Sequence, residues 1–255
     1  MSLEGRVALV TGGGRGAGRA ISLGLAADGA AVAVNYRKDA DAAKETVAAI
    51  EAAGGRASAY QASVDDDAQD AAMVDAVLSD FGHVDILVNN AGIASRGRPV
   101  SDTDPEELLR VVRTHALGAH RLCALVLPSM REQPRGDIVM ISSIATQHYG
   151  PFGAPYNMGK AAMEALAFTL AKEEQRNGIH VNVVAPGLIE TEMGRRLVKA
   201  GGVEDISTLH QYSPFGRVCQ PEDVANVVRY LVSDAGSYLS GQRLYVDGGG
   251  AATPR

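Results

Sequence analysis

Residues 6–18 read RVALVTGGGRGAG, an apolar run followed by a cluster of glycines and the start of a helical pattern. The apolar run predicts a buried strand, because it is nearly continuous in apolar residues. The positions after the glycines have the spacing of one helical face: Ala17, Ala20, Ile21, Gly24 and Leu25. Such a turn can be an ordinary connection, but directly after a buried strand it favours binding of a pyrophosphate by backbone N–H groups.

The alternation of strand and helix continues along the chain. Further apolar runs predict strands at residues 31–35, 86–89, 138–142 and 180–185, with a weaker candidate at 56–61 and a late strand at 242–246. Helical patterns cover residues 39–53, 66–80, 105–131, 155–175 and 221–232. This order predicts a single α/β domain over residues 1–255, a Rossmann-type doubly wound parallel sheet of about seven strands with helices on both faces. Residues 188–216 lack a clear periodicity, and we expect them to form a substrate lid.

Composition narrows the possible functions. The net charge of −6 and the absence of a basic stripe argue against nucleic-acid binding, and no apolar run is long enough to span a membrane. The two cysteines, Cys123 and Cys219, suggest neither a disulfide framework nor a metal site. We therefore expect free thiols in a cytoplasmic protein that binds no metal.

The end of the second predicted strand bears on the choice of cofactor. Sites for NAD place an acid there to bind the ribose hydroxyls, whereas this chain reads Asn35-Tyr36-Arg37-Lys38. Arg15 in the glycine turn adds another cation, and a guanidinium suits a phosphate. Arg37 and Lys38 could instead be solvated charges at a helix start. Because the acid is missing, we predict NADP(H), with NAD(H) as the weaker alternative.

A second group of residues indicates acid–base chemistry. Tyr156 and Lys160 are four positions apart and face the same way on a predicted helix. A cation beside a phenol favours the phenolate, so we expect the Tyr156 pKa to fall. The phenol could then exchange a proton with a carbonyl or alcohol oxygen. Ser143, at the end of the preceding strand, could bind the same oxygen.

The combined motifs resemble the short-chain dehydrogenase/reductase family, in particular its 3-oxoacyl-carrier-protein reductase and glucose dehydrogenase group. The resemblance covers essentially the whole chain through Thr11-Gly-x-x-x-Gly-x-Gly18, Asn89-Asn90-Ala91-Gly92, Ser143, Tyr156-x-x-x-Lys160, Pro186-Gly187 and Asp247-Gly248-Gly249. It implies hydride transfer between a nicotinamide cofactor and a small carbonyl or alcohol. It also implies a homotetramer built through residues 105–131 and 155–175.

The resemblance assigns roles to individual residues. Tyr156 would be the acid/base, Lys160 would lower its pKa and hold the nicotinamide ribose, and Ser143 would orient the carbonyl. Asn90 to Gly92 would border the adenine-ribose side, and Thr191 would lie near the carboxamide. Together with the residues argued above, the expected cofactor contacts are Gly12, Gly14, Arg15, Gly16, Ala17, Gly18, Asn35, Tyr36, Arg37, Ser63, Val64, Asn90, Ala91, Gly92, Tyr156, Lys160, Pro186, Gly187, Ile189 and Thr191.

Two positions depart from the family pattern. Relatives have an aspartate after the third strand that contacts adenine, and this chain has Ser63-Val64. Relatives also have an asparagine that holds a proton-relay water, and this chain has His115 in His-Ala-Leu-Gly. His115 could serve in the relay as a fourth catalytic residue, in which case an ordinary imidazole would titrate near ~6.5 and activity would fall below that pH. It could equally be a packed histidine.

The sequence is also compatible with a function other than catalysis. A catalytically impaired NADP-binding sensor or scaffold is the main alternative, although Ser143, Tyr156 and Lys160 are all present. An extended-branch epimerase would need a larger C-terminal domain than the 68 residues after Gly187. A metal-dependent alcohol dehydrogenase lacks its ligand spacing. The substrate pocket would draw on residues 93–98, where Arg96 and Arg98 could meet an anion, and on His148, Tyr149, Phe152, Met193, Leu197, Leu209 and Tyr212.

Overall fold

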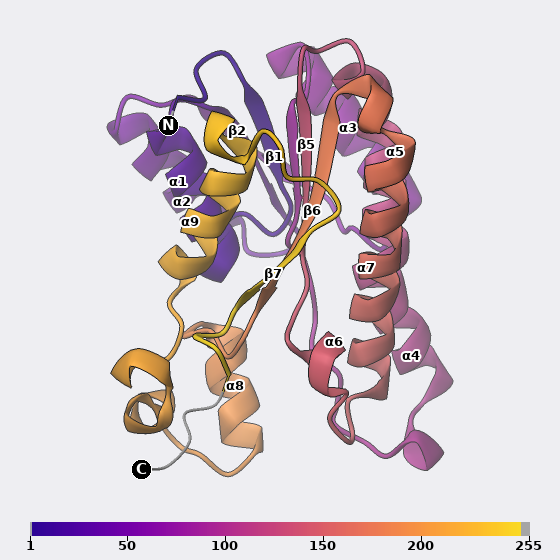
Figure 1. Ribbon diagram of the computed structural model, residues 1–255, viewed down its shortest axis with the longest axis vertical. Helices are drawn as coiled ribbons and strands as arrows, with labels where there is room; N and C mark the ends of the chain where they lie inside the picture. The colour runs from indigo at the N-terminus through magenta and orange to yellow at the C-terminus, as the bar shows by residue number, and fades with distance from the viewer. Residues whose placement is uncertain (1, 251–255) are drawn as a thin grey trace.

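Seven parallel strands form one sheet at the centre of the computed structural model, which describes residues 2–250 (Figure 1). The strands are β1 (Val7–Val10), β2 (Ala31–Tyr36), β3 (Ala57–Gln61), β4 (Ile86–Asn89), β5 (Gly136–Ile141), β6 (Ile179–Pro186) and β7 (Arg243–Val246). Their order is β3-β2-β1-β4-β5-β6-β7. The fold class predicted from the sequence is thereby confirmed, including the weaker strand at 56–61 and the late strand at 242–246.

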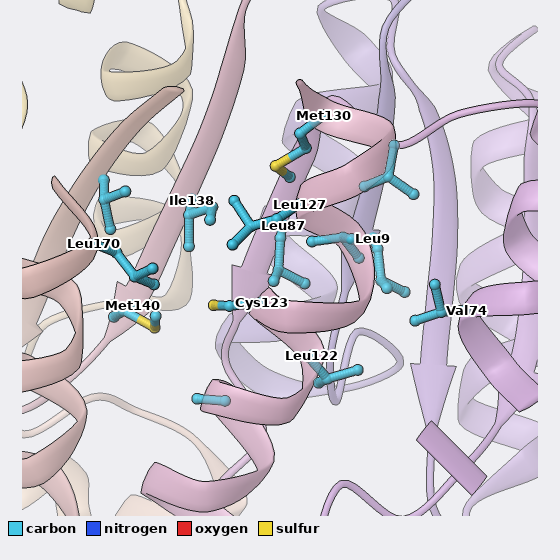
Figure 2. Close-up of a cluster of buried hydrophobic side chains, with 14 of the residues drawn as sticks. Leu9, Val74, Leu87, Leu122, Cys123, Leu127, Met130, Ile138, Met140 and Leu170 are labelled. Atoms are coloured by element: carbon cyan, nitrogen blue, oxygen red, sulfur yellow. The ribbon is translucent and has the colours of Figure 1, made fainter. Parts of the chain in front are cut away.

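Helices cover both faces of the sheet, as Figure 1 shows. One face carries α1 (Gly16–Ala27), α2 (Ala40–Ala52) and α9 (Pro221–Val232), and the other carries α3 (Asp67–Phe81), α5 (Gly118–Met130) and α7 (Ala154–Glu173). Successive strand residues point to opposite faces, so Leu9 belongs to the core under α3, α5 and α7, and Val10 to the core under α1 and α9. Figure 2 shows the first of these cores, where Leu9, Leu87 and Ile138 meet Leu122 and Leu127.

The strand order reverses between β1 and β4, because the chain crosses to β2 and β3 before it returns to the centre. In open α/β sheets, ligands bind at the carboxyl ends of the strands on either side of such a reversal. At this end of the sheet lie the short helix α6 (Ala145–His148) and α8 (Glu192–Ala200) (Figure 1).

Two segments differ from the sequence-based expectation. The helix expected over residues 105–131 is divided into α4 (Pro105–Val112), a π-helical turn (Arg113–Leu117) and α5. Residues 188–216, expected to have no regular structure, contain α8 and two short 3₁₀ helices (Ile206–Tyr212 and Pro214–Gly216). No helix within residues 2–250 combines the length and the apolar character needed to cross a membrane.

Candidate active site

The glycine turn between β1 and α1 has the conformation that its sequence requires. Gly12 and Gly16 have φ of +60° and +54°, values that favour glycine. A Cβ on Gly18 would lie 2.2 Å from the Gly12 carbonyl oxygen, so glycine is needed there for close packing of the helix start on the turn. The first turn of α1 has no capping side chain. Its N–H groups, at the positive end of the helix dipole, can therefore bind a phosphate, and the turn fits a dinucleotide.

Hydrogen bonds hold this turn to the neighbouring strand ends. The Thr11 hydroxyl accepts from the backbone N–H groups of Asn90 and Ala91, both at 2.9 Å. The Asn90 side chain donates to the Thr11 carbonyl oxygen at 2.8 Å. Gly92, two residues after Asn90, packs against the His115 ring, because a Cβ added at Gly92 would lie 2.7 Å from that ring. The motifs at residues 11–18 and 89–92 are thus held together by hydrogen bonds at the carboxyl ends of β1 and β4.

Asn35 has a different task from the one expected. Its side chain is 2% exposed, accepts from the Gly12 N–H at 3.1 Å and donates to the carbonyl oxygens of Tyr60 and Ala62. The Asn35 amide therefore supports the glycine turn and does not lie open to a ribose. The accessible side chains at the end of β2 are those of Tyr36, which is half-buried, and Arg37, which is exposed.

Two carboxylates lie beside the expected phosphate site. The Arg15 guanidinium is 3.2 Å from the Glu192 carboxylate at the start of α8 and 4.0 Å from Asp39, the N-cap of α2. The sequence argument relied on the lack of an acid at the end of β2, and Asp39 brings one close to Arg15. Arg15 is thus shared between two acids, whereas Arg37 makes no ion pair within residues 2–250.

Ser63 and Val64 lie where β3 runs toward α3. The Ser63 hydroxyl donates to Asp65, and its N–H donates to the Gln69 side chain at 2.9 Å. Val64 is buried, and its carbonyl oxygen would lie 1.9 Å from a Cβ on Gly118. The segment is therefore fixed by its own hydrogen bonds and by its packing against α5. Of the two side chains, that of Ser63 is half-buried and that of Val64 is buried.

Ser143, Tyr156 and Lys160 come together at the carboxyl end of β5. Lys160 is buried, its ammonium donates to the Ile141 carbonyl oxygen at 2.7 Å, and its nitrogen lies 5.8 Å from the centre of the Tyr156 ring. Burial raises the pKa of Tyr156, and a hydrogen bond with Ser143 lowers it. The expected net fall of the Tyr156 pKa is therefore wrong, because desolvation outweighs the favourable contacts. Burial also lowers the pKa of Lys160 to about 7, against the charge of Glu164.

His115 lies in the π-helical turn, a type of helix irregularity that is frequent at functional sites. Its ring is 0% exposed and meets the Tyr156 ring edge-on, with centroids 5.2 Å apart. Nε2 is 2.8 Å from the Ile93 carbonyl oxygen, and the buried Nδ1 has no hydrogen-bond partner within residues 2–250. Burial, followed by the charge of Lys160, lowers the His115 pKa to about 3. The ring is therefore neutral at physiological pH, which is what a packed histidine requires, and it does not titrate near the ordinary value of ~6.5.

The segment after β6 faces the glycine turn. The Gly187 N–H donates to the Val246 carbonyl oxygen at 3.0 Å, and the Pro186 carbonyl oxygen accepts from Ile144. Ile189 forms an isolated bridge to Cys219. Thr191 caps α8 by accepting from the Gly194 N–H, and its methyl group lies 3.3 Å from the position of a Cβ on Gly16. The segment therefore runs from the end of β6 to the start of α1, and it contains Pro186, Gly187, Ile189 and Thr191.

Comparison with known proteins identifies the fold family. The family model described as enoyl-(acyl carrier protein) reductase matches residues 12–251. The chain is a short-chain dehydrogenase/reductase. This oxidoreductase is 38% identical over 249 residues to 3-oxoacyl-[acyl-carrier-protein] reductase of Synechocystis sp., covering 97% of the chain and 98% of that relative.

Solved structures of the family agree with this identification. A 7α-hydroxysteroid dehydrogenase in complex with NADH and 7-oxoglycochenodeoxycholic acid superposes with a TM-score of 0.89 at 34% identity, covering 98% of this chain and 95% of that one. A short-chain dehydrogenase from Burkholderia cenocepacia in complex with NADP gives 0.88 at 34% identity, with 97% and 98% covered. The chain is thus an NAD(P)-dependent oxidoreductase that acts on carbonyl or alcohol substrates.

Sequence reasoning missed several polar residues of this dehydrogenase site. Glu164 follows Lys160 by four positions and is 4% exposed, with bonds to Ser142, Thr146 and Arg243. Its signal was available, since it continues the spacing that joins Tyr156 to Lys160. Asp39 and Glu192 had no such signal, because their proximity to Arg15 depends on how three distant segments fold together.

The residues that the sequence analysis expected around a substrate differ in their exposure and in their partners. Arg96 is engaged by the buried Glu107, with its N–H 2.5 Å and its Nε 3.8 Å from the carboxylate, whereas Arg98 is exposed. Exposed apolar side chains lie on both the loop before α7 and the segment after β6: Tyr149, Phe152, Met193, Leu197 and Tyr212. Within residues 2–250 no cluster of His, Cys, Asp and Glu could hold a metal ion.

Proposed function

We propose that the protein transfers a hydride between NADP(H) and a carbonyl or alcohol substrate, with Tyr156 as the acid/base. The observation that carries this proposal is the meeting of Ser143, Tyr156 and Lys160 at the carboxyl end of β5, beside the turn that fits a dinucleotide. The His115 ring packs edge-on against the Tyr156 ring.

The residues divide the chemistry of reduction among them. The nicotinamide supplies the hydride when it is bound. Because burial raises its pKa, Tyr156 stays protonated near neutral pH and can donate a proton to the carbonyl oxygen. The Ser143 hydroxyl holds that oxygen. The Lys160 ammonium, fixed by the Ile141 carbonyl, stabilises the negative charge that develops on the phenol.

The cofactor proposal is NADP(H) in preference to NAD(H). Its support is the exposed pair Arg37 and Lys38 at the end of β2, where a 2′-phosphate would lie, together with Arg15. Asp39 and Glu192 compete for Arg15, so Arg37 and Lys38 carry most of the preference. Gly12 to Gly18 would hold the pyrophosphate, Asn90 to Gly92 would border the adenine ribose, and Pro186 to Thr191 would line the nicotinamide.

For the substrate we propose a carbonyl compound with an apolar body, such as an acyl thioester or a steroid. Residues 188–216 would act as its lid, because they present Met193, Leu197 and Tyr212 to solvent. Tyr149 and Phe152 stand on the other side with φ of 47° and 63°, unfavourable values for aromatic residues that are typical of ligand-binding loops. A cytoplasmic location and a single domain remain part of this proposal.

The experiment is a panel of ketones, oxoacyl thioesters and sugars, assayed by the consumption of NADPH with the native protein and Tyr156→Phe. We expect apolar ketones or oxoacyl thioesters to be reduced, and Tyr156→Phe to lose at least about a hundredfold in turnover while it still binds NADPH. Tyr156→Phe with near-native turnover would refute the mechanism. Tight NADPH binding with no substrate reduced would favour the sensor or scaffold instead.

A further inference from the structure

Glu164 is a buried carboxylate on the same face of α7 as the two active-site residues. Tyr156, Lys160 and Glu164 are spaced by four residues, so they form one line along the helix. Glu164 lies one turn beyond Lys160 and is 4% exposed. A buried charge is costly unless it is paired and hydrogen-bonded, so its partners need to be identified.

The carboxylate has three partners from three different elements. One oxygen accepts from the hydroxyls of Ser142 at 2.6 Å and Thr146 at 2.7 Å. The other oxygen accepts from Arg243 of β7 at 2.6 Å. The guanidinium of Arg243 in turn lies over the Tyr245 ring, 5.1 Å from its centre. Glu164 thus joins the end of β5, α6 and β7 to the helix that carries Tyr156.

These hydrogen bonds hold the backbone on both sides of Ser143. Ser142 precedes it directly, and Thr146 follows three residues later, so the backbone on both sides of Ser143 is tied to one carboxylate. The Thr146 hydroxyl is also 2.9 Å from the Ser143 carbonyl oxygen. Because the Ser143 hydroxyl has to meet the substrate oxygen, the position of this short segment bears directly on turnover.

The charge of Glu164 also acts on Lys160. The groups that face Lys160 are Tyr156 and Glu164 from α7 and the neutral His115 from the π-helical turn, while Arg243, Tyr245 and Tyr149 lie around the far side of Glu164. Burial favours a neutral Lys160, and the negative charge of Glu164 favours the ammonium. Arg243 reduces that negative charge from the other side.

We infer that Glu164 is a positioning residue for the reaction, which fixes the Ser143 segment through Ser142 and Thr146 and places a negative charge one helical turn from Lys160. The inference rests on the proposed function, because it concerns the same site. It assigns Glu164 no contact with substrate or cofactor.

The effect of the Glu164 charge on Lys160 is tested with two variants that should move the titration of Lys160 in opposite directions. Glu164→Gln keeps the size of the side chain and one acceptor oxygen for Ser142 and Thr146, but it removes the charge and the oxygen that accepts from Arg243. Lys160 should then titrate about one pH unit lower. Turnover should then be about tenfold below native at pH 8 and close to native at pH 5.5. Arg243→Gln removes the positive charge that offsets the Glu164 carboxylate, so Lys160 should titrate at a higher pH. The fall in turnover with rising pH, the basic limb of the pH profile, should then move to higher pH.

Two further variants separate charge from positioning and from stability. The double variant Ser142→Ala/Thr146→Val keeps the carboxylate but removes two of its bonds, and it should lose about tenfold in turnover at every pH. Glu174→Gln is the matched control. Glu174 is also buried at the end of α7 and is paired with an arginine, Arg131 at 2.5 Å, but it is not among the groups that act on Lys160. It should lower the unfolding temperature without moving the limb.

The titration of Lys160 can be followed without substrate or cofactor, by NMR of protein with carbon-13 lysine. The chain has five lysines, and Lys160→Arg assigns the signal. Unmoved Lys160 titration and an unmoved limb in both Glu164→Gln and Arg243→Gln would overturn the inference. If Glu164→Gln does not fold, an unmoved titration in Arg243→Gln alone overturns it. Near-native turnover of Tyr156→Phe would instead refute the proposed function, and the NMR titration would still decide whether Glu164 controls Lys160.

Discussion

At the scale of single residues, burial decides what His115 can do. The sequence left two roles open, a relay group that titrates in the physiological range and a packed ring. The ring is fully enclosed between Gly92, Gly159 and Tyr156, and its pKa is lowered to about 3. A group whose pKa lies that low stays neutral from pH 5 to pH 9, so protonation of His115 cannot cause a fall in activity over this range.

His115→Asn should therefore leave the shape of the pH profile unchanged between pH 5 and pH 9. The smaller side chain leaves part of the space around Gly92 and Gly159 unfilled, so we expect a loss of about 1–3 kcal/mol in the free energy of unfolding. Turnover against pH and urea denaturation of both proteins provide the measurements. An acid limb near pH 6.5 in the native protein that disappears in His115→Asn would contradict this account.

The pKa of Lys160 predicts how the rate of carbonyl reduction depends on pH. Burial lowers its pKa to about 7, so the ammonium is complete below that pH and is lost as the pH rises through it. The raised pKa of Tyr156 keeps the phenol protonated over the same interval, so Tyr156 does not add a limb there. Carbonyl reduction should thus slow as the pH rises through about 7. Rates with saturating NADPH from pH 5 to pH 9 test this, and a rate that rises over pH 7–9 would refute it.

The residue scale also shows how far sequence reasoning reaches. Tyr156 and Lys160 were found because their spacing reflects helix geometry, and Ser143 because it ends the preceding strand, and the three do come together. The direction of the Tyr156 pKa was missed, because it depends on how much water the fold removes from the phenol. The role of Asn35 was missed for a similar reason, since only the fold shows that its amide is used up by the backbone of Gly12, Tyr60 and Ala62.

At the scale of elements, the strands were predictable and some helices were not. Strands covered on both faces are apolar at nearly every position, which leaves a strong signal in the sequence. The helix α8 has only nine residues, and its apolar pair Met193 and Leu197, four positions apart, is exposed and not part of the core. A pattern that short was not recognised as a helix. The π-helical turn at residues 113–117 has no signal of its own, because its extra residue is accommodated by packing, including Gly118 against Val64.

The junction of β2 and α2 carries a prediction on cofactor choice. Arg37→Ala should lower the ratio of kcat/KM for NADPH to that for NADH by about tenfold, because a charge-assisted bond to the 2′-phosphate is worth about 1.5–3 kcal/mol. Asp39→Asn should raise the ratio, because it removes one of the two acids beside Arg15 and a negative charge from the junction. Both ratios are measured with one accepted carbonyl. A native protein that uses NADH as well as NADPH would contradict the proposal.

At the scale of the whole molecule, one layer of helices has exposed leucines on its outer surface. The helices α4, α5 and α7 form a layer on one side (Figure 1). Leu109 of α4 and Leu117 at the end of the π-helical turn are 60% and 57% exposed, although leucines in such a layer would ordinarily be buried. The resemblance to the family implies that α4, α5 and α7 of neighbouring subunits pack together in a homotetramer, and these two leucines would then be covered.

The double variant Leu109→Glu/Leu117→Glu should therefore dissociate the assembly into smaller species. Burial of each leucine is worth about 1.5–3 kcal/mol, and a carboxylate in its place would have to be desolvated against a neighbouring subunit. Light scattering at micromolar concentration should give the mass of four chains for the native protein and less for the variant. Leu197→Glu is the control, since Leu197 is as exposed, at 62%, but lies on α8 away from this layer. It should keep the native mass and alter only the use of apolar substrates. A native monomer, or equal loss of mass in both variants, would refute assembly through α4, α5 and α7.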